Sequence, residues 1–266
     1  MSVVAGPLLL AAFGPGVKEI ADIISLFDFS GSIQVDVRDE KKNVYLHEDL
    51  APSYGALTSN TLKNLDDELK IMITATMKKL AKQTDRSWEG ILSTMMQNPL
   101  IQPEGQPTVR SEMLLKDSVN DFKFDGSPDA SIVHEVQAWF QKLIGDEDVL
   151  RSTKIDLPVM AKIVAQTGAT ITGILSMLSK HEVHSKSVVD IGVLRFPDID
   201  HPHFKLYRIQ LNAWSDCTRH LFHQVDKNGI AGTFNSYNFV PRKSVMKDMA
   251  DKAHKAAVDE ANQLFA

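Results

Sequence analysis

The stretch SVVDIGVLRFPDIDHPHFKLYRIQLNAW, residues 187–214, decides the fold. Its two ends, SVVDIGVLRF and FKLYRIQLNAW, are rich in β-branched and aromatic residues and flank the turn-forming segment PDIDHPH. Such runs, bounded by Pro and Asp, are typical of neighbouring antiparallel strands. Two further runs, TRHLFHQV and IAGTFNSYNFV, follow and are joined through DKNG. The pattern predicts a four-stranded antiparallel meander late in the chain.

Upstream of this meander the apolar spacing is mostly helical, apart from one early hairpin at residues 31–47. The Pro- and Gly-containing residues 99–110 are predicted to form a loop. Helices are predicted over residues 4–27, 58–82, 88–98, 127–145 with Ser127 as its cap, 157–178 and 243–265. The early hairpin can pair with the late strands. The sequence therefore predicts a single interlaced α+β domain over residues 1–266, with helices packed on a mainly antiparallel sheet formed by the late meander plus the early hairpin.

Composition and charge narrow the classes of function. Hydrophobic residues make up 43% of the chain, charged residues 24%, and the net charge is −5. This balance is ordinary for a globular protein and predicts no nucleic-acid partner. The apolar start of the chain has no Lys or Arg before Lys18, so we expect no signal peptide. Gln166 and several threonines dilute the apolar residues 157–178, so we expect no transmembrane helix.

Cys217 is the only cysteine in the 266 residues, and its surroundings, WSDCTRHLFH, allow three interpretations. The first is a small buried hydrophobic residue, which is where free cysteines most often lie. The second is a nucleophile for a fatty acyl transferase or thioesterase, with His223 and Arg219 as its nearest helpers. If residues 217–225 form one strand, His223 shares a face with Cys217 but lies too far along it to touch the sulfur.

The third interpretation is that Cys217 carries a fatty acyl chain as a thioester. This requires an apolar slot, because each buried CH₂ contributes roughly 0.8 kcal/mol. The slot is predicted to combine aromatic and aliphatic residues around the cysteine with small residues of the predicted helix 157–178. The predicted acyl-chain pocket consists of Trp214, Leu221, Phe222, Ala165 and Ala169.

The segment NAWSDCTRHLF, with SVVDIGVLRFPD upstream and GTFNSYNFVPR downstream, resembles the Erwinia virulence factor family in overall character. The resemblance implies an α+β protein that promotes bacterial persistence in the insect gut and carries palmitate on a cysteine. It implies no other cofactor, a fatty acyl donor and possible contact with a membrane surface as partners, and a location in the bacterial cytoplasm or outside the cell after release. Only Cys217 can carry the lipid here, because the chain has no other cysteine.

The order of helices and strands is also similar, in architecture only, to the Cyt-type insecticidal toxins. That similarity implies a pore-forming toxin as a second alternative. No metal site is predicted: the pairs His181 with His184 and His201 with His203 are expected at opposite ends of one strand.

Overall fold

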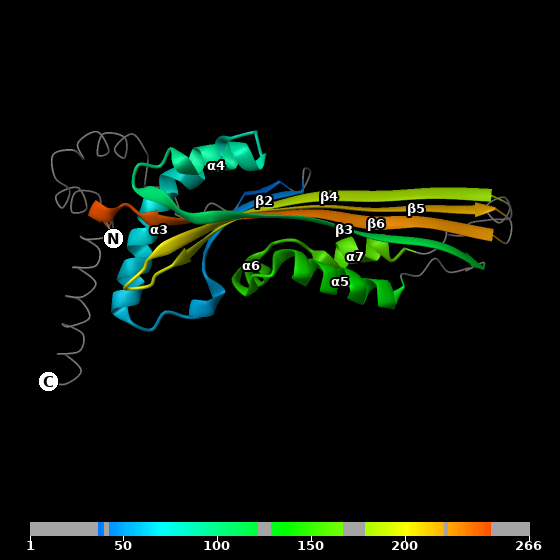
Figure 1. The fold of residues 1–266 in the computed structure, drawn as a ribbon, viewed down its shortest axis with the longest axis horizontal. Coiled ribbons are helices and arrows are strands. Elements are labelled where there is room, and N and C mark those ends of the chain that lie inside the picture. The colour runs from blue at the N-terminus through cyan, green and yellow to red at the C-terminus, as the bar shows by residue number, and fades with distance from the viewer. Residues whose placement is uncertain (1–36, 40–42, 122–128, 167–178, 221–222, 246–266) are drawn as a thin grey trace.

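The structure, a computed structural model, describes residues 37–39, 43–121, 129–166, 179–220 and 223–245. A six-stranded sheet with the order β1-β2-β4-β5-β6-β3 runs the length of this region (Figure 1). All neighbouring strands pair antiparallel except β2 and β4, which are parallel. The strands are β1 (Val37–Asp39), β2 (Val44–Leu50), β3 (Ile101–Asp121), β4 (Ser179–Phe196), β5 (His203–His220) and β6 (His223–Pro241).

Helices cover both faces of the sheet, so the predicted α+β class is confirmed. The early hairpin, β1 and β2, joins the late strands through β4, and this pairing interlaces the two halves of the chain as predicted. The helices are α3 (Asn60–Lys82), α4 (Trp88–Met96), α5 (Ala130–Ile144), α6 (Glu147–Ser152) and α7 (Leu157–Val164), with a short 3-10 turn, η2, at Pro52–Tyr54.

Two apolar cores lie on opposite faces of the sheet. Strand alternation sends Leu46, Ile191 and Leu206 to one face, where they pack with residues of α3 and α4. It sends Ile209, Leu211 and Phe234 to the other face, beneath α5 and α7. Figure 1 shows α5, α6 and α7 together on this second side of the sheet. We call the two sides the α4 face and the α7 face.

The predicted meander is wrong in one respect: residues 218–225 do not form a separate strand. β5 continues to His220, the chain reverses, and β6 begins at His223. DKNG, residues 226–229, lies inside β6 instead of forming a turn. Gly229 is required there because the Trp214 indole lies against its backbone and would overlap a Cβ. A close approach between neighbouring strands thus has the same sequence signature as a turn.

The predicted loop at 99–110 is also mostly wrong, because these residues begin the long strand β3. β3 is the outer strand of the sheet, next to β6 alone. An outer strand tolerates Pro103 and Pro107, since the missing N–H groups need not face a partner. The pairing shifts between Glu104 and Thr108, where Gly105 adopts a φ of 73°.

The helix predictions at 58–82 and 88–98 are confirmed by α3 and α4, within a residue or two. The helix predicted from Ser127 begins at Ala130, because the Asp129 side chain accepts a hydrogen bond from the Ser131 N–H at 2.8 Å and caps it. The predicted helix at 4–27, the second half of 157–178 and nearly all of 243–265 lie outside the described residues. Of the helices that the structure describes, none combines the length and hydropathy that crossing a membrane requires.

Candidate functional site

Cys217 lies in β5 on the α7 face and is completely buried. Its direct neighbours across the sheet are Glu182 on β4 and Asp226 on β6. The Cys217 Sγ lies 3.6 Å from the carbonyl oxygen of Gln166, two residues beyond the end of α7, and 3.9 Å from Oδ1 of Asn228. The thiol is therefore enclosed between the sheet and the end of this helix.

A buried polar cluster surrounds the thiol. Asn228 holds the end of α7 in place, because its Nδ2 donates to the carbonyl oxygens of Val164 at 2.9 Å and Gln166 at 2.7 Å. The Gln224 Nε2 donates to Oδ2 of Asp226 at 2.6 Å. Strand alternation and pairing put the members of the cluster on one face, and each is at most 2% exposed: Ser215, Cys217, Gln224, Asp226 and Asn228.

Two polar atoms of this cluster, Ser215 Oγ and Gln224 Oε1, have no hydrogen-bond partner within the described part of the chain. An unpaired polar group in a protein interior costs about 1–3 kcal/mol. The Ser215 hydroxyl is two positions from Cys217 on the same strand face. The cluster thus has an unused donor close to the thiol, which the oxygen of a group attached to sulfur would satisfy.

The structure separates the residues predicted to line an acyl pocket. Ala165 is completely buried at the end of α7, next to the residue whose carbonyl contacts the thiol. Trp214 does not line this space: it lies on the α4 face, against Gly229, because positions 214 and 217 have opposite parity along the strand. Leu221, Phe222 and Ala169 lie outside the described residues.

The strand pairing places the backbones of the two predicted catalytic helpers differently relative to Cys217. The chain reverses between Cys217 and His223, so His223 pairs with His220, three positions along the hairpin from the Cys217–Asp226 pair. Three positions correspond to about 10 Å along a strand. Arg219 stays two positions from Cys217 and pairs with Gln224. The Cys217 S–H group faces two oxygen acceptors, the Gln166 carbonyl and Oδ1 of Asn228.

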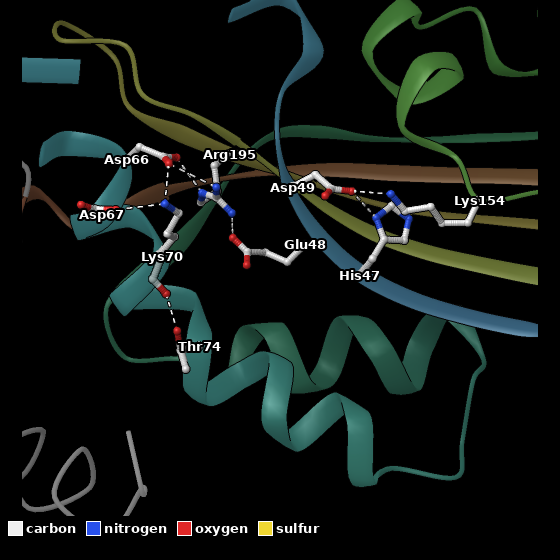
Figure 2. A network of polar contacts seen from close by, with 9 residues as sticks. All are labelled: His47, Glu48, Asp49, Asp66, Asp67, Lys70, Thr74, Lys154 and Arg195. Atoms are coloured by element: carbon white, nitrogen blue, oxygen red, sulfur yellow. Dashed lines mark hydrogen bonds and ion pairs between the residues drawn. The ribbon is translucent and has the colours of Figure 1, made fainter. Parts of the chain in front are cut away.

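The sequence analysis missed a second polar network, which involves three consecutive residues of β2, His47, Glu48 and Asp49. Figure 2 shows His47 and Asp49 directed to one side of the strand and Glu48 to the other. The signal was present in the sequence, because HED lies between the apolar run VYL and Leu50, directly at the end of the predicted hairpin 31–47.

His47 is 2% exposed and both of its ring nitrogens have partners. Nδ1 lies 2.7 Å from Oδ2 of Asp49, and Nε2 lies 3.1 Å from Oδ1 of Asp190 and 3.0 Å from the Tyr207 hydroxyl. Burial alone would lower the pKa of His47, but hydrogen bonds and charge from Asp190 and Asp49 outweigh it and raise the pKa to about 9. The ring is therefore a cation at neutral pH and cannot act as a general base.

Asp190, which is fully buried, connects this cation to the segment between α6 and α7. Its Oδ2 accepts from the Thr153 hydroxyl at 2.6 Å and from the Lys154 backbone N–H at 3.1 Å. Burial, together with the negative charge of Asp190, raises the pKa of Tyr207 well above its ordinary value. This part of the network joins β2, β4, β5 and the α6–α7 connection.

Gly192 makes the contact between His47 and Tyr207 possible. It lies directly between them in the sheet, paired with His47 on one side and Tyr207 on the other. A Cβ at position 192 would overlap the Tyr207 ring, which crosses over the glycine to reach His47. The substitution Gly192→Ala is expected to lower the free energy of unfolding by about 1–3 kcal/mol, measured by urea denaturation.

A double-mutant cycle supplies the control for Gly192→Ala. In a Tyr207→Leu background the ring is gone, so the Gly192→Ala substitution is expected to cost clearly less there than it does in the parent protein. An equal cost in both backgrounds would mean that the tyrosine ring is not what excludes a side chain at this position.

The Glu48 side of β2 forms a buried ion cluster around Arg195 of β4. The Arg195 Nε and Nη2 donate to Oδ1 and Oδ2 of Asp66 on α3, at 2.7 and 3.2 Å, and Nη1 pairs with Glu48. Lys70 adds a contact of 3.0 Å to Asp66 from the helix surface (Figure 2). Burial lowers the pKa of Arg195 to about 10, so the group remains charged at neutral pH. The partners of these groups are within the protein, which indicates a structural role.

Neither protein-family models nor curated proteins match this sequence. Among the described residues no three His, Cys, Asp or Glu side chains gather as a metal site would require. His181 and His184 lie inside β4 near its first residues, and His201 and His203 lie beyond the other end of that strand. Of the two polar regions, the Cys217 cluster alone combines a thiol with polar atoms that have no hydrogen-bond partner among the described residues, and we take it as the candidate site.

Proposed function

We propose that Cys217 carries a fatty acyl group, palmitoyl by resemblance to the Erwinia virulence factor family, as a thioester. The protein would act as a virulence factor that promotes persistence in the insect gut. The observation that carries the proposal is the Ser215 hydroxyl, which has no hydrogen-bond partner in the part of the chain that the structure describes and lies two positions from a fully buried thiol. Buried polar groups are normally paired, so an unused donor beside a modifiable atom favours a further group at this point.

The chemistry of attachment fits the neighbouring groups. The Cys217 sulfur attacks the carbonyl carbon of an acyl thioester donor, the new S–C bond forms, and the donor's thiol leaves with the proton from Cys217. The thioester sulfur no longer donates to the Gln166 carbonyl, while the new carbonyl oxygen can accept from Ser215 O–H.

Apolar residues that are completely buried continue from the thiol along the α7 face: Ala161, Val164, Ala165, Ala213 and Ile230. Each CH₂ of an acyl chain that moves from water to a position among these residues contributes roughly 0.8 kcal/mol, which favours retention inside the protein. If the chain leaves this position, a single acyl group gives only reversible membrane binding. We therefore expect peripheral membrane association only, and the family resemblance implies a protein in the bacterial cytoplasm or released from it.

The intact mass of the purified full chain, before and after neutral hydroxylamine, tests the attachment. We expect a fatty acyl increment that hydroxylamine removes and that Cys217→Ser lacks, with the variant folded because the substitution is nearly isosteric. Ser215→Ala is expected to reduce the acylated fraction. Ser187→Ala, an exposed serine on the α4 face of β4, is the matched control and leaves it unchanged. An unmodified parent protein, or unfolding of Cys217→Ser, would assign the thiol to core packing.

One observation also favours an enzyme, a fatty acyl transferase or thioesterase in which acyl-Cys217 is an intermediate. The Ser215 hydroxyl, without a partner among the residues of known placement, would stabilise the oxyanion that forms when the thioester is attacked. Turnover separates the two functions. A stable adduct supports attachment, whereas an adduct that clears when water, an amine or an alcohol is offered supports catalysis.

A further inference from the structure

An open groove of about 340 Å³ lies on the α4 face, away from the Cys217 cluster. Its floor is formed by three neighbouring strands, with β6 between β3 and β5. Two rows of residues paired across these strands face the groove, and each row is called a rung. Side chains paired across such a rung share a face, and so do residues two apart along each strand. One rung is Val109–Asn235–Arg208 and the next is Ser111–Thr233–Gln210.

The wall of the groove is the first turn of α4, residues Ser87, Trp88 and Glu89. Ser87 caps this helix by accepting from the Gly90 N–H at 3.1 Å, so the position of the turn is fixed. The Trp88 side chain packs against the apolar core on the α4 face but is only partly buried, so part of its surface is exposed to solvent. Val109 is 66% exposed at the edge of the floor, so the groove has apolar surface on two sides.

Arg208 is pre-positioned and joins the floor to the wall. Its Nε donates to the Arg86 carbonyl oxygen at 2.8 Å, immediately before α4, and its Nη2 donates to Oε1 of Gln210 at 2.6 Å. These two bonds fix the plane of the guanidinium. The groove thus contains fixed donors and acceptors.

The charges of the groove oppose one another. Burial lowers the pKa of Arg208, whereas the negative charges of Glu89 and Asp85 raise it. Both carboxylates are therefore close enough to attract the guanidinium. A small anion that approached Arg208 would meet these two carboxylates. The groove therefore favours a neutral ligand with several hydroxyl groups over a carboxylate or phosphate.

We propose that this groove binds one neutral sugar unit. A pyranose ring has an apolar C–H face, which the exposed surface of Trp88 and Val109 can contact, and hydroxyl groups that donate and accept at once. Amide, guanidinium and hydroxyl groups in fixed positions complement such hydroxyls. The volume is at the lower end of the range for small-molecule sites, which suits a single ring at the end of a glycan.

The test is a chemical-shift titration of the ¹⁵N-labelled full chain with methyl glycosides of glucose, galactose and mannose and with N-acetylglucosamine. We expect at least one of these probes to shift groove resonances, with a Kd on the order of 1 mM. Each hydrogen bond contributes only a small net free energy, so a few of them cannot give a higher affinity. Gln210→Ala is expected to weaken binding about twofold to tenfold, the range that one lost hydrogen bond produces.

Asn212→Ala is the matched control, because Asn212 is also exposed, lies on the same strand and face, and is one rung outside the groove. We expect it to leave the affinity unchanged. The inference is overturned if no probe shifts groove resonances, if inorganic phosphate or acetate shifts them and the sugars do not, or if both variants weaken binding equally. Acylation of Cys217 plays no part in the titration, so the two proposals stand or fall separately.

Discussion

Replacing Arg195 with methionine is expected to lower the free energy of unfolding by about 3–5 kcal/mol, because it leaves buried charges without their partner. The Glu48 and Asp66 side chains are only 5% and 6% exposed. Both contact the Arg195 guanidinium, which binds Asp66 through two nitrogens. Methionine fills a similar volume, so the loss of charge outweighs the loss of packing. Urea denaturation at neutral pH measures the effect.

Lys70→Met is the control for Arg195→Met. Lys70 contacts the same carboxylate, Asp66, but its side chain is 30% exposed, and such ion pairs contribute about 0–1 kcal/mol. A cost for Arg195→Met no larger than that of Lys70→Met would mean that water reaches Glu48 and Asp66 when the arginine is removed. The guanidinium would then not be what holds α3 against β2 and β4.

Local signals in the sequence predict the elements of this fold better than their pairing. The helical spacing around Leu65, Leu69 and Ile73 was sufficient to locate α3. The strand patterns of 187–196 and 204–214 located only parts of β4 and β5, because β4 begins at Ser179 and β5 continues to His220. The errors arose where a residue serves a distant partner. Gly229 gives room to Trp214, and Asn228 holds the end of α7, so an apparent turn is the middle of a strand.

The same limit applies to the candidate site. That Cys217 is the only thiol is visible in the sequence, and so is the small-residue helix that covers it. Which side chains share its face depends on the pairing of β5 with β6: because His220 pairs with His223, Asp226 and not His223 lies beside the thiol. The contact between His47 and Asp190 joins residues 143 positions apart, and no local pattern specifies the parallel pairing that creates it.

The stability of the protein is expected to fall between pH 6.5 and about 9, because of His47. Its pKa is about 9 in the folded protein and about 6.5 in the unfolded chain. Below pH 6.5 both states hold the proton and the full stabilisation is present. As the pH rises toward 9 the unfolded state releases the proton first, so folding becomes progressively less favourable. The difference between these two pKa values corresponds to a loss on the order of 3 kcal/mol.

Urea denaturation at a series of pH values from 6 to 9 measures this loss, and His47→Gln isolates it, because glutamine keeps a polar side chain but does not titrate. The variant is expected to be less stable near pH 6 and to change less with pH than the parent. Parallel profiles for the two proteins would mean that Asp190 and Asp49 do not hold a proton on His47. The network beneath the α6–α7 connection would then bind a neutral imidazole, and the Tyr207 hydroxyl at 3.0 Å would become the donor to its Nε2.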